Sequence, residues 1–598
     1  MSLIQPASIG KKTTARTVGR HQQSLMAMLS ITLVMFGGIG SRLAYLQLVE
    51  GSRNRQMAEN NRIRLIPKQP ERGTIFDRNG KILASSRLSH SVYVWPMAPK
   101  KPEWSVTLTR LSQILHIPEA DIQKRLKQAG YNSPTLVRVA RDLSPAQITA
   151  LAEYSNQLED VEVYIEAVRE YPNGELAAHV LGYTGEMSDE QLAKKHNQGY
   201  RLGDLIGQMG VEAAFEQQLR GEWGGQQVEV DGAGRIVRIL GEKQAKSGKD
   251  VHLALDLKLQ KAAEAALGDR QGAIVALDPR NGEVLALVSR PTFNPNIFTK
   301  RITPAQWRSL QSKDHPFVNR ALRGFPPAST FKIITTTAGI ESGKFSPNTV
   351  LQTYACMNIG GISFCDWNRA GFGPLGFAGA LAWSSDTFFY QIGRGIGGPT
   401  LIEWTRKYGF GQKTGIELAR EESPGLVADN AWKQKNLKLP WSVGDTVNMS
   451  IGQGFLQVSS LQTAIMFAVP ANGGYRVKPH LLKDNEEAKN WRESLNLKPE
   501  TLRVLRQGLR QVVSSGTGRA LDVPTIPPTS GKSGTAEAFG NNSHAWFGAY
   551  APSDRPEIVV VAFAEHSGGG GGKVAAPMVL KVLEAHFERG EKKQGEIK

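Results

Sequence analysis

Cysteine is almost missing from this chain, which has two cysteines among 598 residues. That number excludes a disulfide-rich scaffold and a zinc or iron–sulfur site built from four cysteines. Acidic residues are outnumbered as well, because 55 Asp and Glu against 72 Lys and Arg leave a formal net charge of +17. The positive surplus favours a polyanionic neighbourhood: nucleic acid, an anionic membrane or an acidic polymer. Long uncharged runs are scarce, which excludes a multi-span membrane protein, and the length predicts about three to five domains.

The one long uncharged run follows a basic N-terminus. Residues 1–23 hold four lysines or arginines and no acidic residue, and after Arg20 no charge occurs before Arg42 if His21 is neutral. About 20 apolar residues cross a bilayer as a helix, and basic flanks favour the cytoplasmic side. We therefore predict a cytoplasmic tail at 1–23, a single-pass anchor in the cell (inner) membrane at 24–44 and an extracytoplasmic body, which argues against nucleic acid as a partner. The alternative is a cleaved signal peptide, because residues 37–41 include small residues where a peptidase could cut.

The two cysteines flank a predicted hairpin. Gly360 and Gly361 lie midway between Cys356 and Cys365 and indicate a two-residue loop. Counting outward from this loop places Cys356 opposite Cys365 as a non-hydrogen-bonded pair, with Cα atoms about 4.5 Å apart. That distance is within disulfide range, so we predict a disulfide. The alternative is two small buried thiols that never bond.

A polar run at residues 242–250 predicts a linker between two blocks that differ in their pattern of apolar residues. The first block mixes short extended pieces with amphipathic helical pieces, at 91–95, 106–115 and 146–158, and offers no nucleophile beside a base. The second block has strands near both of its ends and helices mainly between them. Helices are expected at 257–267 and 576–587, and strands at 273–277, 283–288, 544–551 and 558–564. This pattern predicts an α+β fold with an antiparallel sheet covered by helices.

Two prolines precede Ser329 and predict that this serine lies in the first turn of a helix. Lys332 then shares its helical face, and unpaired N–H groups at the helix start could stabilise an oxyanion. A serine hydroxyl becomes a nucleophile when a base takes its proton, and a lysine can do so only when it is neutral. Burial and a second cation would have to lower the lysine pKa from about 10.4. The pattern alone is weak evidence, because Ser8 and Lys11 repeat it.

Two further polar motifs follow in the second block. Ser384 and Asp386 place a hydroxyl and an acid two residues apart, which could relay a proton or hold a lysine. A helix N-cap is the alternative for this pair. The Lys-Ser-Gly-Thr sequence at 532–535 would present, on an edge strand, a cation for a carboxylate and a glycine that a peptide can approach closely. Its first three residues recur at 246–248 without the threonine, so this motif is also weak by itself.

The three motifs occur together and in order, and this combination resembles the active-site motifs of penicillin-binding proteins and serine β-lactamases. Residues 72–80 and 207–212 resemble the pedestal, or dimerisation, module of class B penicillin-binding proteins. Residues 448–454 resemble a further segment of their transpeptidase domain. The resemblance implies an elongated mixed α/β pedestal at 45–249. It also implies a transpeptidase (penicillin-binding/β-lactamase-like) domain at 250–598, with a five-stranded antiparallel sheet covered by helices.

Asp386 departs from the family, whose middle motif usually ends in asparagine. The departure puts in doubt any role that needs an amide, and a carboxylate here could pair with a nearby lysine. The residues that follow, 387–390, resemble the elongation-type subfamily, penicillin-binding protein 2, more than the division type. We therefore expect a function in cell-wall elongation and shape maintenance, with septal division as the alternative.

The resemblance implies a peptidoglycan D,D-transpeptidase that works through an acyl-serine intermediate. Ser329, deprotonated by the general base Lys332, attacks the penultimate D-alanine carbonyl of a stem peptide. Ser384 and Lys532 relay a proton to the leaving D-alanine. An amine of a neighbouring stem peptide then takes the acyl group and forms a cross-link, and β-lactams acylate the same serine.

The resemblance also implies a binding set and partners. Asp386, Ser533, Gly534 and Thr535 are the expected substrate-binding residues, and the backbone N–H groups of Ser329 and Thr535 form the oxyanion hole. No metal or organic cofactor is implied. The expected partners are stem peptides ending in D-Ala-D-Ala, β-lactams, and a membrane peptidoglycan glycosyltransferase with other elongation-complex proteins, because the chain shows no polymerising domain.

Three other classes share parts of this pattern. A β-lactamase would also be acylated but would release penicillin rapidly, and it rarely carries a pedestal on a membrane anchor. A β-lactam sensor needs a cytoplasmic output, for which residues 1–23 leave little room. A non-catalytic scaffold that activates a membrane glycosyltransferase would keep its biological activity without Ser329. Penicillin turnover and replacement of Ser329 separate these possibilities.

Overall fold

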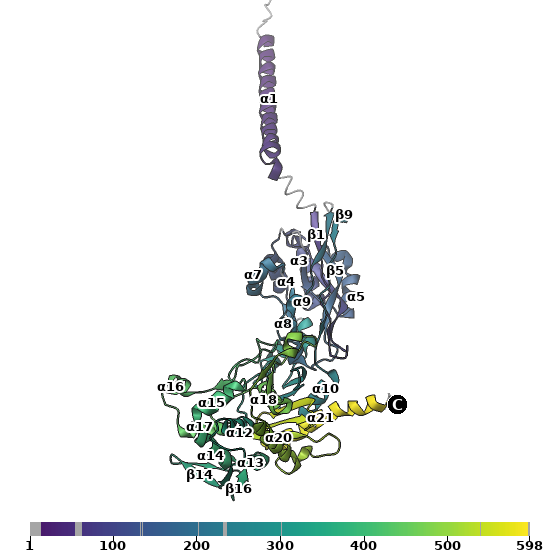
Figure 1. The fold of residues 1–598 in the computed structure, drawn as a ribbon. Coiled ribbons are helices and arrows are strands. Elements are labelled where there is room, and N and C mark those ends of the chain that lie inside the picture. The colour runs from purple at the N-terminus through teal and green to yellow at the C-terminus, as the bar shows by residue number, and fades with distance from the viewer. Residues whose placement is uncertain are drawn as a thin grey trace, which may run out of the picture.

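The computed structural model describes residues 13–53, 63–131, 133, 136–200, 203–230, 236–300, 302–538 and 540–595. Figure 1 shows an elongated molecule, with helix α1 (Thr13–Ala44) at one end, the first block in the middle and the larger second block at the other end. The first part of the predicted cytoplasmic tail, residues 1–12, lies outside the described residues. The boundaries predicted for the tail, the anchor and the two blocks remain predictions.

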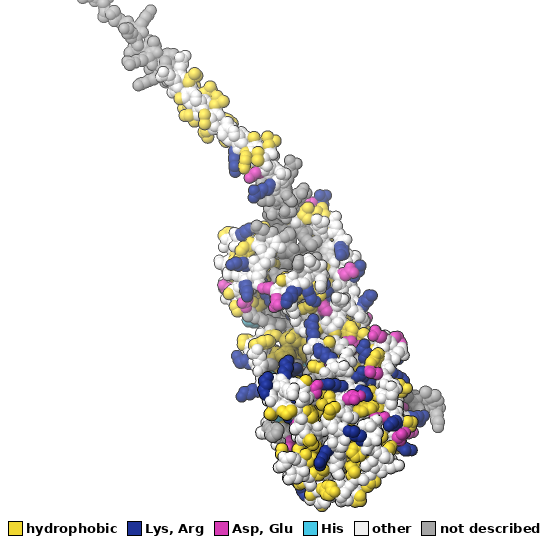
Figure 2. Space-filling view, turned by 60° about the vertical axis from the view of Figure 1, so that its left-hand side comes forward, with side chains coloured by type: hydrophobic (Ala, Val, Ile, Leu, Met, Phe, Trp, Pro, Cys, Tyr) yellow, Lys and Arg dark blue, Asp and Glu magenta, His cyan; other side chains and the backbone are white. Residues whose placement is uncertain are grey.

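Helix α1 has the properties of a membrane span. Within the described part of the chain one helix is long and apolar enough to cross a membrane, over Gln22–Val49 with a mean hydropathy of 1.7. Its apolar side chains are exposed, and Figure 2 shows them along the projecting helix. The hydroxyls of Ser30 and Thr32 each donate to the carbonyl four residues earlier, over 2.8 Å. These polar groups are therefore satisfied within the helix, as a lipid environment requires.

Among its described residues, the pedestal has three small sheets and a helical layer, and the smallest sheet pairs β6 (Thr184–Glu186) with β7 (Leu205–Gly207). Its first sheet has the order β1-β8-β9, and its second has the order β10-β2-β3-β4 with β5 paired to β3. The strands are β1 (Ile63–Lys68), β2 (Ile75–Phe76), β3 (Ile82–Val94), β4 (Val137–Ala140), β5 (Val161–Glu170), β8 (Gly224–Val230), β9 (Ile236–Lys243) and β10 (Val251–His252). The helices α3 (Trp104–Leu115), α4 (Glu119–Ala129) and α5 (Pro145–Glu153) bury their apolar faces against β3 and β4. The structure therefore contains the mixed α/β pedestal that the resemblance implied.

The polar run at 242–250 packs against the pedestal and is not a free linker. Gly248 N–H donates to Glu71 O over 2.8 Å, and Lys249 N–H donates to Gln218 O over 2.9 Å. A side chain on Gly73 would collide with the Lys249 carbonyl, so only glycine permits this approach. The polar composition suggested a linker, but the backbone groups of the run are paired by the pedestal.

The second block contains a five-stranded antiparallel sheet of order β12-β11-β23-β22-β21. Its strands are β11 (Gly272–Leu277), β12 (Val284–Arg290), β21 (Ser530–Ala538), β22 (Asn541–Ala551) and β23 (Ile558–Ala564). The helices α10 (Leu257–Leu267) and α21 (Gly571–Gly595) cover one face, and α12 (Lys332–Glu341) and α18 (Ser460–Asn472) cover the other. Successive residues of β11 alternate between the two helical layers: Ile274 faces the first layer and Val275 the second. The predicted sheet is confirmed, and β21 lies at its edge.

Direct contacts join the pedestal to the second block. Asp77 Oδ2 accepts from the Leu257 N–H over 3.1 Å, at the start of α10. Arg78 forms an ion pair with Glu283 over 3.1 Å. Strand β10 enters the pedestal sheet by pairing in parallel with β2. The chain that leads into the second block is therefore fixed on the pedestal before the first helix of that block begins.

The two pedestal motifs meet at Glu212, which is fully buried. Arg72 Nε and Arg169 Nε each donate to one of its carboxylate oxygens, both over 2.6 Å. Arg169 also donates through Nη1 to Gly73 O over 2.8 Å. Burial acts to raise the pKa of Glu212, but the two guanidinium groups outweigh it and hold that pKa below its usual value. A shared carboxylate on the short helix α8 (Gly210–Ala214) thus joins segments that are far apart in the sequence.

Replacing Glu212 by glutamine is expected to lower the free energy of unfolding by about 3–5 kcal/mol, because two buried guanidinium groups lose their shared carboxylate. The stabilisation is present above the unfolded pKa of about 4.3 and is lost as the pH falls through the lower folded pKa. Denaturant unfolding of the detergent-solubilised chain, followed by circular dichroism, measures both effects. Glu190→Gln is the control, since its ion pair with Lys194 is exposed. Equal denaturant midpoints for Glu212→Gln and Glu190→Gln would contradict the stabilising role of the Glu212 ion pairs.

Candidate active site

Ser329 lies in a 3₁₀ turn, η6 (Ala328–Phe331), that runs directly into α12. The two prolines come just before this turn, as the sequence predicted. Ala328, at a φ of 51°, donates its N–H to Gly452 O over 3.0 Å. A side chain on Gly452 would collide with the Ala328 carbonyl, so the segment at 448–454 holds the turn from behind. Ser329 itself is partly exposed.

Lys332 extends from the start of α12 into the interior, and its side chain is fully buried. Its Nζ donates to Ser384 O over 2.8 Å, to Ser384 Oγ over 3.3 Å and to Asp386 Oδ1 over 2.6 Å. Three acceptors are the number that a lysine ammonium can serve. Each of these contacts leads to the second motif and none of them to Ser329.

Ser384 lies in the sharp connection between two helices. It follows α13 (Phe377–Trp383) with a φ of 56°, and Ser385 then caps α14 (Asp386–Ile396) by accepting from the Phe388 N–H. The helix cap that competed with a chemical role is therefore made by Ser385, and Ser384 Oγ points to the lysines.

Lys532 lies on the edge strand β21 and is also fully buried. Its Nζ donates to Ser384 Oγ over 2.8 Å and to Ser533 O over 2.9 Å. Burial, together with the positive charge of Lys332, lowers the pKa of Lys532 well below its ordinary value, while Asp386 opposes the shift. This shift favours the neutral form of Lys532, and the general-base role of Lys332 remains a prediction.

Asp386 forms a 2.6 Å ion pair with Lys332. This is the pairing with a lysine that a carboxylate in place of asparagine suggested. Burial raises the pKa of the Asp386 carboxyl, and the two lysines act in the opposite direction. The carboxylate therefore supplies a negative charge in direct contact with Lys332.

The other residues of the third motif surround the Ser329 turn. A Cβ on Gly534 would lie 3.2 Å from Pro327 O and 3.2 Å from Thr330 Cγ2, so the glycine lets η6 pack against β21. Ser533 Oγ lies 2.7 Å from Thr517 Oγ1. Thr535 is exposed, and its Oγ1 accepts from the Gly571 N–H over 3.3 Å. The close neighbour at Gly534 is thus the nucleophile segment, and Thr535 is the residue of the motif that faces solvent.

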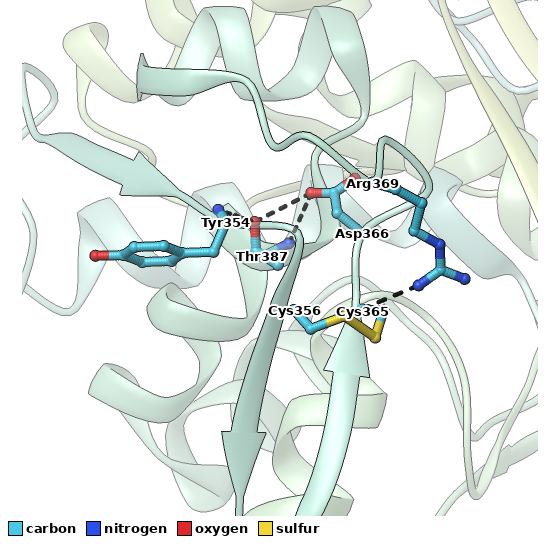
Figure 3. Close-up of a disulfide and its surroundings, with 6 residues drawn as sticks. All are labelled: Tyr354, Cys356, Cys365, Asp366, Arg369 and Thr387. Atoms are coloured by element: carbon cyan, nitrogen blue, oxygen red, sulfur yellow. Dashed lines mark hydrogen bonds between the residues drawn. A yellow bond between two sulfur atoms is a disulfide. The ribbon is translucent and has the colours of Figure 1, made fainter.

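The predicted cysteine hairpin is present, with β14 (Cys356–Ile359) antiparallel to β15 (Ile362–Cys365). Its register pairs Cys356 with Cys365, and the structure joins them in a disulfide with Cα atoms 3.9 Å apart. Figure 3 shows this disulfide near Thr387, the residue after the Ser384-x-Asp386 motif, and near Asp366, which is hydrogen-bonded to Thr387. Asp366 and Thr517 were missed by sequence reasoning, although the position of Asp366 directly after Cys365 was a usable signal. Among the described residues, no cluster of three or more His, Cys, Asp or Glu side chains is arranged to hold a metal ion.

A nucleophile at a helix start, a serine held between two buried lysines and a polar edge strand define a serine acyltransferase of the penicillin-recognising class. Two family models match the chain. The "Penicillin binding protein transpeptidase domain" covers residues 272–584, and the "Penicillin-binding Protein dimerisation domain" covers residues 67–253. The chain therefore belongs to the penicillin-binding proteins that carry a dimerisation domain, as the sequence motifs indicated.

Similar proteins of known identity indicate the subfamily within the penicillin-binding proteins. The chain is 34% identical over 573 residues to the peptidoglycan D,D-transpeptidase MrdA of Acinetobacter baumannii, covering 90% of this chain and 84% of the relative. Among solved structures, the penicillin-binding protein PBP2 of Helicobacter pylori in complex with MreC is 27% identical. That match has a TM-score of 0.77 and covers 88% of this chain and 99% of the other. A chain of a peptidoglycan synthase complex that coordinates polymerization and crosslinking is 32% identical, with a TM-score of 0.69 and coverages of 95% and 98%. The expected likeness to penicillin-binding protein 2 is confirmed.

Lys532→Met is expected to slow acylation of the protein by a penicillin by about 10²–10⁴-fold, because the proton path through Ser384 ends at a side chain without a nitrogen. The folded-state pKa of Lys532 is lowered, so the unfolded chain binds more protons and stability rises with pH up to the unfolded pKa of about 10.4. Lys532→Met removes this contribution to the slope of the free energy of unfolding against pH. Unfolding midpoints between pH 7 and 9 measure it. The exposed Lys581→Met is the control, and an unchanged slope in Lys532→Met would contradict the assignment.

Proposed function

We propose that the chain is a membrane-anchored peptidoglycan D,D-transpeptidase that cross-links stem peptides during cell-wall elongation. The observation that carries the proposal is the Ser384 hydroxyl, which lies within hydrogen-bond distance of both Lys332 and Lys532. Side chains of all three motifs meet at this atom, and Ser329 lies on the turn that runs into the helix of Lys332. The relatives named MrdA and PBP2 support the elongation type over the division type.

Acylation begins with attack by Ser329 Oγ on the penultimate D-alanine carbonyl of the donor peptide. Lys332 takes the serine proton as the general base, after one of its own protons has passed through Ser384 to the neutral form of Lys532. The backbone N–H groups of Ser329 and Thr535 stabilise the oxyanion. Because β21 is an edge strand, its outer side is open to an extended peptide that pairs by strand addition. Thr535, Ser533 and Gly534 then lie along the donor, and Asp386 keeps Lys332 in place.

The second half of the reaction releases D-alanine and forms the cross-link. The C–N bond of the tetrahedral intermediate breaks as Ser384 donates its proton to the leaving amine, and Lys532 replenishes the Ser384 proton. An amine of a second stem peptide then attacks the acyl ester, returns a proton to the same relay and frees Ser329. A β-lactam places its amide in the donor position and leaves the serine acylated.

The membrane anchor and the positive charge support the proposed location. Basic residues before α1 favour an N-terminus in the cytoplasm and a body outside it. We expect a membrane glycosyltransferase as partner, since a structural relative belongs to a complex that couples polymerization with crosslinking. An MreC-like protein is a second expected partner, because the H. pylori relative is found in complex with MreC.

Covalent labelling of the full chain with a fluorescent penicillin tests the catalytic proposal. Stable labelling of the wild type and its loss in Ser329→Ala are expected, because only an acyl ester on this hydroxyl survives denaturing electrophoresis. Ser8→Ala disrupts the other Ser-x-x-Lys pattern and serves as the matched control, with full labelling expected. Label released within seconds would indicate a β-lactamase. A folded chain that takes up no label would indicate the non-catalytic scaffold.

Protease treatment of intact and detergent-opened spheroplasts tests the orientation. With the body outside the cytoplasm, protease added to intact spheroplasts is expected to digest it and leave a short anchored fragment that carries an N-terminal tag. A cytoplasmic protein in the same sample controls for leakage. Digestion only after detergent would reverse the proposed orientation, and an N-terminus at the body would indicate a cleaved signal peptide.

A further inference from the structure

Asp366 lies directly after the cysteine hairpin and is buried, with 1% of its surface exposed. None of the motifs identified in the sequence contains it. Figure 3 shows its carboxylate hydrogen-bonded to Thr387, with the disulfide nearby. A buried carboxylate in this position needs a reason, because desolvating a charge without partners is strongly unfavourable.

One carboxylate oxygen of Asp366 accepts three hydrogen bonds from the second motif. Ser385 Oγ donates to Oδ2 over 2.7 Å, and Thr387 donates to it through its backbone N–H and its hydroxyl, both over 3.1 Å. Ser385 and Thr387 are the residues on either side of Asp386. Ser384 directly precedes them, so the contact fixes the backbone that carries both Ser384 and Asp386.

The chemistry of the contact suits a clamp. The N–H of Thr387 belongs to the first turn of α14, where a negative charge is favoured by unpaired amides and by the helix dipole. Charged acceptors form stronger hydrogen bonds than neutral ones. The carboxylate is thus held by the groups that it positions, without a lysine or arginine in hydrogen-bond contact among the described residues.

The disulfide holds the other side of the clamp. Asp366 N–H donates to Ala355 O over 2.8 Å, which continues the hairpin by one residue pair beyond Cys356 and Cys365. The covalent link therefore lies next to the backbone of Asp366. Cys356 is exposed, and Arg369 donates to its sulfur over 3.9 Å, so the bond can be reached from solvent.

We propose that Asp366 is a positioning residue for acylation, and that the Cys356–Cys365 disulfide keeps its carboxylate against the start of α14. Asp366 acts on the reaction through Ser384, which must stay between the two buried lysines. The inference rests on the proposed transpeptidase function and adds a residue that sequence motifs do not reveal. It also makes the reaction depend on the oxidation state of the hairpin.

Acylation kinetics of the full chain in detergent test the proposal. Asp366→Ala is expected to lower the acylation rate constant for a fluorescent penicillin by about 10–100-fold, because a catalytic group displaced by roughly 1 Å loses about that much. The dissociation constant of the non-covalent penicillin complex is expected to stay within about twofold, since Asp366 does not line the edge strand. Asp366→Asn keeps one acceptor oxygen and is expected to recover part of the rate. Adding Thr387→Val to Asp366→Ala should cause no further loss, because both act on one contact.

Glu422 provides a matched control for a buried carboxylate. It is also buried, and one of its oxygens accepts from the Thr414 N–H over 2.7 Å and from the Thr414 hydroxyl over 2.6 Å. It touches none of the three motifs. Glu422→Ala is therefore expected to lower the unfolding temperature as Asp366→Ala does while leaving the acylation rate constant unchanged.

The disulfide provides a test that needs no substitution at Asp366. A water-soluble phosphine cleaves the S–S bond with one water molecule, giving two thiols and the phosphine oxide. Reduction is expected to slow acylation of the wild type. A variant with both Cys356→Ser and Cys365→Ser should be slow from the start and insensitive to the phosphine.

The outcomes are distinguishable from those of the proposed function. Absence of wild-type labelling would overturn the transpeptidase assignment itself. A wild type that is acylated at Ser329, together with an Asp366→Ala variant of unchanged rate constant, would overturn only the positioning role. A rate loss that Glu422→Ala reproduces would likewise reduce Asp366 to a structural residue. If Asp366→Ala does not fold, the proposal is tested by Thr387→Val and by reduction of the wild type with the phosphine. Unchanged acylation rate constants in both experiments would overturn it.

Discussion

Two buried lysine nitrogens lie within hydrogen-bond distance of one hydroxyl, that of Ser384. Two ammonium groups so close together in a dry site repel each other strongly, because little solvent screens them. The site relieves the repulsion in two ways: Asp386 pairs with Lys332, and the pKa of Lys532 is lowered so that its neutral form is favoured. This asymmetry is also what proton transfer requires, since one member of a relay must be able to accept.

The fold is arranged to keep this unfavourable pair in place. Lys332 comes from the first turn of α12, Ser384 from the connection between α13 and α14, and Lys532 from the edge strand β21. Gly534 lets the Ser329 turn pack against β21, and Gly452 supports the same turn from the other side. Helices on both faces of the sheet exclude water from the lysines. The pedestal fixes the chain before this block begins, which separates the membrane end from the chemistry.

Sequence alone predicted the features that depend on neighbouring residues. The hairpin register followed from the two-glycine loop at Gly360, and the strands of the sheet followed from their apolar runs and turns. It did not predict that the polar run at 242–250 would be bound by the pedestal, because hydrogen bonds to distant backbone leave no trace in composition. Asp366 was missed for the same reason, since its partners lie about twenty residues further along the chain. Which lysine would be neutral depended on burial and charges from three separate elements.

The carboxylates of Asp386 and Asp366 both lie at the backbone of residues 384–387, and they have different roles. Asp386 neutralises the charge of Lys332, while Asp366 accepts hydrogen bonds from the residues that flank Asp386. The negative charge of Asp366 also acts to raise the pKa of Asp386, in the same direction as burial. An asparagine at 386 would remove that repulsion but leave Lys332 without its closest counter-charge. A carboxylate at this position is tolerable beside Asp366 because the two have different partners: the start of α14 donates its hydrogen bonds to Asp366, and Lys332 pairs with Asp386.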